Sequence, residues 1–239
     1  MLPIAIDDLT SSYNIASFLT LDPGFEHMLG FTQAEVSELV DTIYQDFCID
    51  PTTRGEVNDL IKNQYNGYHF VNPDSEAVYN PTMLMYFLRQ LSENKTIPAD
   101  LFDLNMRTDL TWIRRLTRGN EENTRELVFQ LTTDESIPFN RKALVSQFNM
   151  LEFFEPAFYP VSLFYLGLLT RKDEFDLKVP NLSMKEIAVE YFNEVFRIDP
   201  GQERYKEMMQ GFIRKPDLTR LFSDYWRLYV SQLPEAIFS

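Results

Sequence analysis

The stretch "YNGYHFVNPDSEAVYNPTMLMYFL", residues 65–88, contains a turn, an aromatic ribbon and the start of a helix in close succession. Asn66-Gly67 is a turn signal, because glycine adopts positive φ without steric cost and asparagine is the next best residue there. The segments "YHFV" and "AVYN" predict a short two-stranded ribbon around "NPDSE". Asn80 suits a helix N-cap, and Pro81 suits the first helical position, where its missing N–H is not needed. We therefore expect a helix, a small ribbon and a second helix.

We interpret this stretch as a structural joint rather than a catalyst. Tyrosine and phenylalanine supply large rigid apolar surfaces, and tyrosine adds a polar tip. The asparagine and the proline determine where the next helix begins, and so how its apolar face meets the core. The residues of this motif are Tyr65, Asn66, Gly67, Tyr68, Tyr79, Asn80 and Pro81.

Amphipathic helices are predicted on both sides of the joint. The sequence "TQAE" is a capping-box pattern, because the Thr32 hydroxyl can accept from the Glu35 amide while the Glu35 side chain reaches back. Apolar residues then recur at spacings of three and four, which is typical of one helix face. The expected buried positions are Val36, Leu39, Val40, Ile43 and Phe47, then Val57, Leu60, Ile61 and Tyr65, and then Leu84, Phe87, Leu88 and Leu91.

The later part of the chain predicts helices followed by a β-hairpin. A polar stretch at 94–108 suggests a soft boundary, and helices are expected near 109–117, 121–131 and 140–148, with an apolar helix ending near Gly167. The segments "LLTRK" and "FDLKV" predict two strands around a tight "DE" turn, and "SMKE" predicts a second capping box. Helices followed by such a hairpin are the layout of a winged-helix domain.

The predicted fold is therefore mainly α. Only 8 glycines occur in 239 residues, which favours helices over a strand-rich sandwich. We expect three parts: a helical region with a small β-ribbon at 1–95, a winged-helix-like domain with a short β-hairpin at 96–200, and a helical C-terminal tail at 201–239. The tail is expected to be helical through Tyr205, Met208, Met209 and Phe212, and again through Leu218, Leu221, Phe222 and Tyr225.

Charge and cysteine content narrow the function classes. The chain carries 36 acidic and 22 basic residues, a net charge of −14, whereas nucleic-acid binders usually have a basic balance. Its one cysteine, Cys48, cannot form an internal disulfide, so we expect a reducing cytoplasm and interpret Cys48 as a small core residue. The N-terminal "MLPIAIDDLT" does not resemble a signal peptide, and no apolar run is long enough to predict a membrane span.

The sequence offers little chemistry. It has no Gly-x-x-x-x-Gly-Lys phosphate loop. Its two histidines, His27 and His69, are far apart and give no metal-site spacing with one cysteine. We interpret His69, between two aromatic residues, as a packed histidine, and Asp176 with Lys178 as hairpin surface rather than a nuclease strand. No catalytic residue, metal or cofactor is predicted.

Five segments resemble, in order, motifs of the bacterial AAA-ATPase-like proteins. These segments are "PIAIDDLTSSYNIA", "MLGFTQAEV", "YNGYHF", "VYNPTMLMYFL" and "YLGLLT…FDLKVPNLSMKE", within residues 1–197. Members of this family join a P-loop ATPase, a helical lid and a winged-helix region, often followed by a PD-(D/E)XK nuclease domain. The resemblance implies that 1–95 is the lid-like region and that this chain is the lid and winged-helix part alone, a truncated ATPase.

The resemblance also sets the expected function. In the family the phosphate loop lies upstream of the matching segments, so its ATP-binding residues have no counterpart here. Asp7, Asp8 and Thr10 lie closest to where a nucleotide-bearing domain would join, and they are the candidate cofactor-binding residues. We expect a non-catalytic interaction or regulatory module with a protein partner, either the missing ATPase half or a second copy. The alternatives are a fragment that completes a nucleotide site with a partner chain, and a DNA-binding winged helix, which the acidic balance disfavours.

Overall fold

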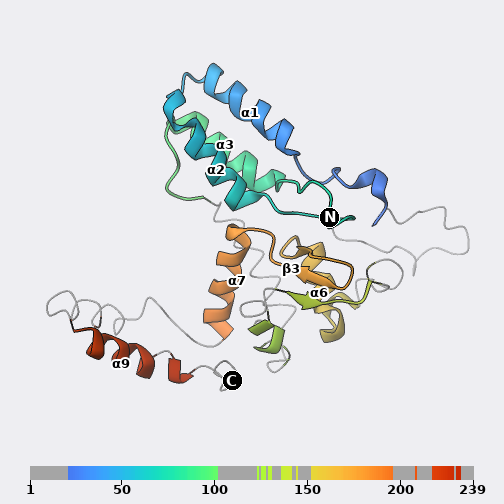
Figure 1. Ribbon diagram of the computed structural model, residues 1–239, viewed down its shortest axis with the longest axis vertical. Helices are drawn as coiled ribbons and strands as arrows, with labels where there is room; N and C mark the ends of the chain where they lie inside the picture. The colour runs from blue at the N-terminus through green and yellow to red at the C-terminus, as the bar shows by residue number, and fades with distance from the viewer. Residues whose placement is uncertain are drawn as a thin grey trace, which may run out of the picture. The chain divides into compact units, whose positions relative to one another are not determined.

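The computed structural model describes residues 21–101, 152–195 and 217–228, together with 136–141, 230–232 and the positions 123, 125–127, 129–130, 144 and 208 (Figure 1). The chain divides into two compact units, Met1–Ala188 and Val189–Ser239. The boundaries expected at 95/96 and 200/201 stay predictions. The stretches 109–117, 140–148 and 205–212 lie largely outside the described residues, whereas the described positions within 121–131 are helical.

Three helices form the first part of the first unit. They are α1 (Gln33–Asp46), α2 (Arg54–Tyr65) and α3 (Pro81–Asn94), and each contacts the other two (Figure 1). The capping box at the start of α1 is confirmed. The Thr32 amide donates to the Glu35 carboxylate at 2.8 Å, and the Glu35 amide donates to the Thr32 hydroxyl at 3.4 Å. These bonds satisfy amides that have no partner inside the helix.

Fewer residues of α1 and α2 are buried than the spacing of their apolar residues predicts. On α1 the buried residues are Val36, Val40 and Tyr44, whereas Leu39 and Ile43 are half-buried and Phe47 is exposed. The prediction for Phe47 is wrong, because the helix ends at Asp46 and the chain turns there. On α2 Leu60 is likewise half-buried. All four apolar positions predicted for α3 are buried, and so are Val57, Ile61 and Tyr65 of α2.

Cys48 is exposed, so its prediction as a core residue is wrong. It adopts a left-handed φ of 52° in the turn after α1. The buried place in this segment belongs to Ile49, which is 5% exposed and whose amide donates to the Tyr44 carbonyl. The turn therefore points the residue after Cys48 inward, which a helical periodicity extended past Asp46 does not anticipate.

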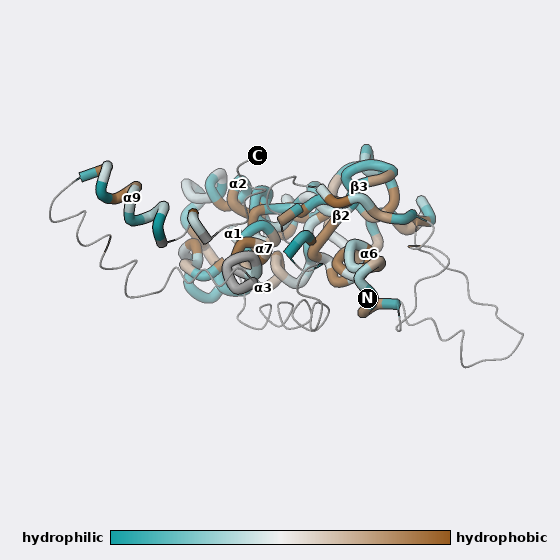
Figure 2. Tube along the Cα trace, turned by 90° about the horizontal axis from the view of Figure 1, so that it is seen from below, coloured by the Kyte–Doolittle hydropathy of each residue, from teal (hydrophilic) through white to brown (hydrophobic). Residues whose placement is uncertain are grey.

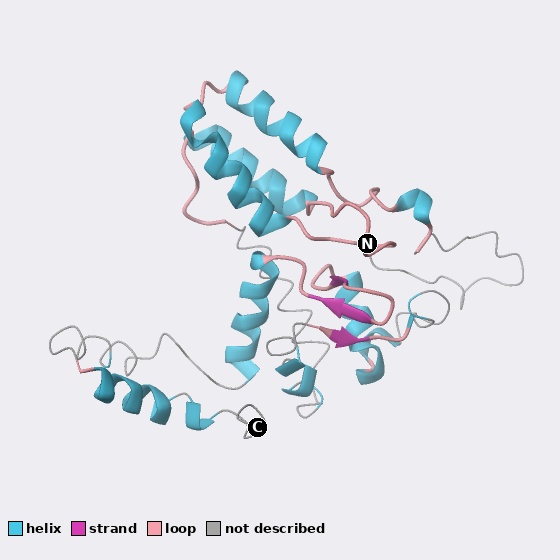
Figure 3. Ribbon diagram, viewed as in Figure 1, coloured by secondary structure: helices cyan, strands magenta, loops and turns pink. Residues whose placement is uncertain are grey.

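The sheet is small and antiparallel, with strands β1 (Ile137–Pro138), β2 (Thr170–Arg171) and β3 (Asp176–Lys178) in the order β1-β3-β2 (Figure 3). The predicted hairpin of β2 and β3 is confirmed. Leu177 lies at its centre, fully buried and opposite both Arg171 and Ile137. The third strand, β1, was not predicted, because two residues give no measurable periodicity and proline is confined to sheet edges.

The helices beside the sheet are α6 (Tyr159–Tyr165) and α7 (Leu182–Val195). The helix predicted to end near Gly167 is confirmed as α6, and Gly167 follows it with a φ of 76°. The predicted "SMKE" capping box is wrong. The first-turn acceptor is Asn181, whose side-chain oxygen accepts from the Met184 amide at 3.0 Å. Ser183 lies inside the helix and is fully buried, and its hydroxyl is satisfied by donating to the Gln64 side chain at 2.9 Å.

The second unit contains α9 (Leu218–Leu228), followed by a 3-10 turn at Val230–Gln232. The Asp217 side chain accepts from the Arg220 amide at 3.1 Å and caps the helix. Hydrophobic and hydrophilic residues alternate along α9 in Figure 2. The prediction of a helix through Leu218 and Tyr225 is confirmed.

The prediction of a mainly helical fold is thus confirmed, and the small antiparallel sheet has three strands, one more than the predicted hairpin. Within the described part of the chain, every helix is too short or too polar to cross a bilayer.

Candidate functional site

The joint, residues 65–81, lies between α2 and α3 and contacts the sheet. The predicted ribbon is shorter than expected: Tyr68 and Val78 form one antiparallel bridge, with N–O distances of 3.2 and 2.9 Å. The next residue, Tyr79, pairs instead with Phe31, at 2.8 and 3.2 Å. The ribbon ends there because the chain beyond Tyr68 turns toward the hairpin.

That turn attaches the joint to strand β2. The His69 amide donates to the Thr170 hydroxyl at 2.6 Å, and this hydroxyl donates to the His69 carbonyl at 2.9 Å. The same carbonyl accepts from the Arg171 amide at 3.3 Å. Thr170 is only 1% exposed, so these bonds are shielded from water. The joint therefore extends the edge of the hairpin and links it to the three helices.

The side chain of His69 is half-buried. Burial, and then the positive charge of Lys178, hold the pKa of His69 below its usual value. The imidazole is therefore neutral at neutral pH, which agrees with its interpretation as a packed residue.

Gly67 adopts a φ of 103°, which favours glycine. A Cβ built on Gly67 would collide with the carbonyl oxygen of Pro180, in the segment that leads into α7. One hydrogen bond fixes the turn itself, and a second one reinforces the contact with the segment before α7. The Gly67 amide donates to the Asn66 side chain at 2.7 Å, and the Asn66 carbonyl accepts from the Asn181 side chain at 2.9 Å. The glycine thus permits the end of α2 and the start of α7 to meet backbone to backbone.

The three tyrosines of the joint are all buried, and each hydroxyl donates to a partner. Tyr65 donates to the Leu101 carbonyl at 2.6 Å, Tyr68 to the Gly167 carbonyl at 3.0 Å, and Tyr79 to the Gln33 side chain at 2.6 Å. Burial raises the pKa of Tyr65 and of Tyr79. Their hydroxyl bonds connect the joint to the start of α1, to the residue that follows α6 and to the segment after α3.

Tyr68→Phe is expected to lower the free energy of unfolding by about 1–2 kcal/mol, because it removes the hydroxyl donor of the half-buried Gly167 carbonyl. Urea unfolding measures the change. Tyr86→Phe is a matched control on α3, where the ring is half-buried, and it should change stability by less than about 0.5 kcal/mol. Equal effects from the two variants would show that the Tyr68 hydroxyl bond contributes nothing.

Asn80→Ala is expected to lower stability by about 1 kcal/mol, because Asn80 caps α3. Its side-chain oxygen accepts from the Met83 amide at 3.2 Å. Thermal unfolding should show a decrease in Tm of about 2–4 °C. Asn80→Asp keeps the acceptor and should recover most of the loss; if it is as unstable as Asn80→Ala, the cap is not the cause.

Glu26 is the residue of this site that the sequence does not reveal. Its side chain is only 8% exposed although it carries a carboxylate. One oxygen accepts from the amides of Phe70 and Val71 at 3.2 Å each, and the other accepts from the Asn72 amide at 2.6 Å. Three successive amides that converge on one anion form a nest. Glu26 thereby holds the segment before α1 against the joint.

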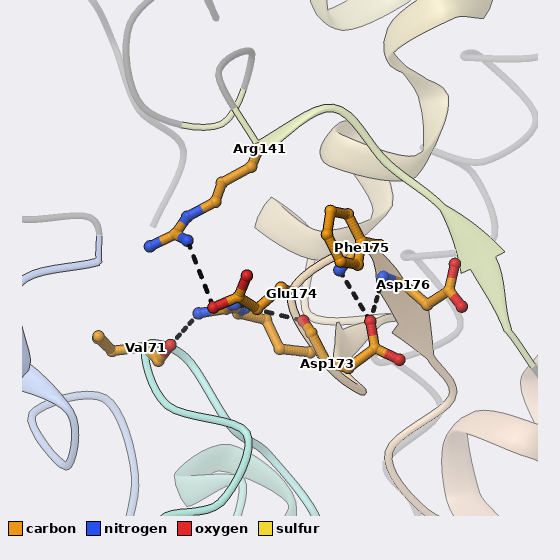
Figure 4. A network of polar contacts seen from close by, with 7 residues as sticks. Val71, Arg141, Asp173, Glu174, Phe175 and Asp176 are labelled. Atoms are coloured by element: carbon orange, nitrogen blue, oxygen red, sulfur yellow. Dashed lines mark hydrogen bonds and ion pairs between the residues drawn. The ribbon is translucent and has the colours of Figure 1, made fainter.

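Arg171 binds the same turn through a backbone carbonyl. It is 3% exposed, and its guanidinium donates to the Val71 carbonyl and, at 3.2 Å, to the Asp173 carbonyl. Figure 4 shows Val71 and Asp173 on the two loops that this residue joins. Burial is the main cause that lowers the pKa of Arg171. The joint and the hairpin are thus connected by side-chain as well as backbone bonds.

The contacts described for this region are hydrogen bonds and side-chain packing. Across the described ranges no group of three histidine, cysteine or acidic side chains is placed to hold a metal ion. The candidate residues Asp7, Asp8 and Thr10 lie outside the described residues. The motif residues are brought together where α2 ends and α3 begins, with the Asn80 amide donating to the Tyr65 carbonyl at 2.9 Å.

Comparison with known protein families, with curated proteins and with solved structures finds no match for this chain.

Proposed function

We propose that this chain is a non-catalytic interaction or regulatory module, equivalent to the lid and winged-helix part of an AAA-ATPase-like protein. The observation that carries the proposal is the character of α6, the helix that precedes the hairpin. Its sequence "YPVSLFY" has no lysine or arginine, and five of its seven residues are buried. A helix that reads DNA presents basic and polar side chains to the groove. This helix is built to pack against protein.

The joint supports the same proposal. It connects the three helices to the hairpin through buried hydrogen bonds, so a partner that engages either element acts on one connected body. The partner we propose is a protein, either the ATPase half that the family resemblance implies or a second copy of the chain. The single cysteine favours a cytoplasmic location for this assembly.

The chain alone is expected to bind no ATP in the presence of Mg²⁺, because its sequence has no phosphate loop. Isothermal titration calorimetry measures this. Micromolar affinity would contradict the proposal and favour the alternative, a fragment that contributes to a nucleotide site shared with a partner chain. In that case the double variant Asp7→Asn, Asp8→Asn should lose the affinity.

Duplex DNA is expected to bind weakly or not at all. The net charge of −14 repels phosphate, and α6 offers no cation to overcome the repulsion. A gel shift at physiological salt measures the affinity. A sub-micromolar shift that weakens steeply with added salt would overturn this expectation and favour a DNA-binding winged helix.

A further inference from the structure

The tip of the hairpin, Lys172–Phe175, presents an aromatic side chain to solvent. Phe175 is 74% exposed, although full burial of a phenylalanine side chain contributes about 1.5–3 kcal/mol. One exposed apolar residue is ordinary by itself. At this tip, however, the backbone that carries it is held in place.

Several hydrogen bonds fix the tip. The Asp173 carboxylate accepts from the amides of Phe175 and Asp176 at 2.7 and 2.8 Å, as Figure 4 shows. The Phe175 carbonyl accepts from the Phe139 amide at 2.9 Å, which continues the β1–β3 pairing. A rigid aromatic anchor loses little conformational entropy on binding, which is the property of residues that dominate interfaces.

An open, mostly apolar pocket lies beside this anchor. It has a volume of about 280 Å³ and is lined by Pro138, Phe139, Asn140, Ala157, Pro160 and Val161. Enclosed apolar cavities of about 150 Å³ accept benzene, so this open pocket has enough volume to receive one face of a phenyl ring. Phe139 belongs to both features, because it lines the pocket and its amide binds the Phe175 carbonyl.

The charges next to the anchor are also self-complementary. Arg141 and Glu174 are exposed and their nearest charged atoms are 4.0 Å apart, with Arg141 facing Glu174 in Figure 4. The two residues form an ion pair within the chain, and about a two-fold axis they can exchange partners, so that each Arg141 faces the Glu174 of the other copy and both charges stay paired. A partner of one uniform charge would instead meet repulsion from one of the two groups.

We propose that the hairpin tip and the pocket form a self-association surface, in which Phe175 of each copy enters the pocket of the other. This deepens the proposed function, on which it rests, by naming a second copy of this chain as the partner. Phe175, the pocket and the Arg141–Glu174 pair all lie next to the hairpin tip. A two-fold contact between identical surfaces requires such a common location. The contact is small, so the dimer is weak and forms at high protein concentration.

Sedimentation velocity over a concentration series tests the proposal. The parent chain should dimerise, and Phe175→Ser or Ala157→Arg should each weaken association at least about tenfold, because one removes the ring and the other fills the pocket. Met85→Ser is the matched control: Met85 is 50% exposed on α3, away from the sheet, and its loss should leave the dimer unchanged.

Mixing the two variants gives the sharper result. A mixed pair has one intact ring and one intact pocket, so the equimolar mixture of Phe175→Ser and Ala157→Arg should associate more strongly than either variant alone. A monomeric parent, a dimer that neither variant weakens, or a mixture no stronger than its components overturns the proposal. ATP titration of the same samples separates the two hypotheses, because nucleotide binding contradicts the proposed function and leaves the dimer result standing.

Discussion

Gly67→Ala is expected to lower the free energy of unfolding by about 3 kcal/mol. A left-handed backbone strains any residue with a Cβ, and this Cβ also meets the Pro180 carbonyl, so strain and overpacking add. Because the first side-chain carbon already collides, Gly67→Val should be at least as unstable as Gly67→Ala. Urea unfolding of both variants beside the parent measures the loss.

Gly167→Ala is the matched control for this prediction. Gly167 also has a positive φ, of 76°, but a Cβ there meets no atom within 4 Å. It should therefore lose only the backbone strain, about 1 kcal/mol. The difference between the two variants measures the contact of Gly67 with Pro180. Equal losses would mean that this contact does not limit the fold, and a Gly67 variant that unfolds like the parent but no longer binds a partner would make the joint a binding site.

Glu26→Ala is expected to cause the second large loss, also about 3 kcal/mol. It leaves the amides of Phe70, Val71 and Asn72 without their acceptor, and a buried unpaired donor costs about 1–3 kcal/mol. Part of the loss is recovered if water enters the space, so the three costs do not add fully. The measurement is again the free energy of unfolding in urea.

Glu26→Gln separates the contributions of the two carboxylate oxygens. The amide oxygen can replace the carboxylate oxygen that serves Phe70 and Val71, but the amide nitrogen then faces the Asn72 amide, donor against donor. We expect about half the loss of Glu26→Ala. Glu38→Ala, at an exposed position of α1, is the control and should change stability by less than about 0.5 kcal/mol. If Glu26→Ala is no worse than this control, the nest does not hold the segment before α1.

Local signals predicted the local parts of this structure. The capping box at Thr32 and the cap at Asn80 each involve atoms within three residues, and α3 shows its buried face through regular spacing. The hairpin was predictable for the same reason. In each case the interacting residues are neighbours in the sequence, so the pattern contains the information.

The rest depends on residues that are far apart in the sequence. Ser183 fits a capping pattern, but its buried hydroxyl serves Gln64, and Asn181 is the cap instead. Glu26 looks like any surface acid until the turn at 70–72 is folded against it. Such partners leave no mark on the surrounding sequence, and so the nest at Glu26, the short strand β1 and the contact of Gly67 with Pro180 required the structure.

The long sequence separation between the joint and its partners affects how the chain folds during translation. Residues 21–94 contain α1, α2, α3 and the Glu26 nest, whereas the bonds that Tyr68, His69 and Asn66 make to Gly167, Thr170 and Asn181 span 99 to 115 residues. Translating residues 95–181 takes about 4–17 s at roughly 5–20 residues per second. During that interval the ribosome-bound chain carries the three helices and the joint without the hairpin that later packs on the joint. Of Glu26 and Arg171, which both bind the turn at 70–72, only Glu26 has then been synthesised. This interval is when the nascent chain is most open to chaperones and to aggregation.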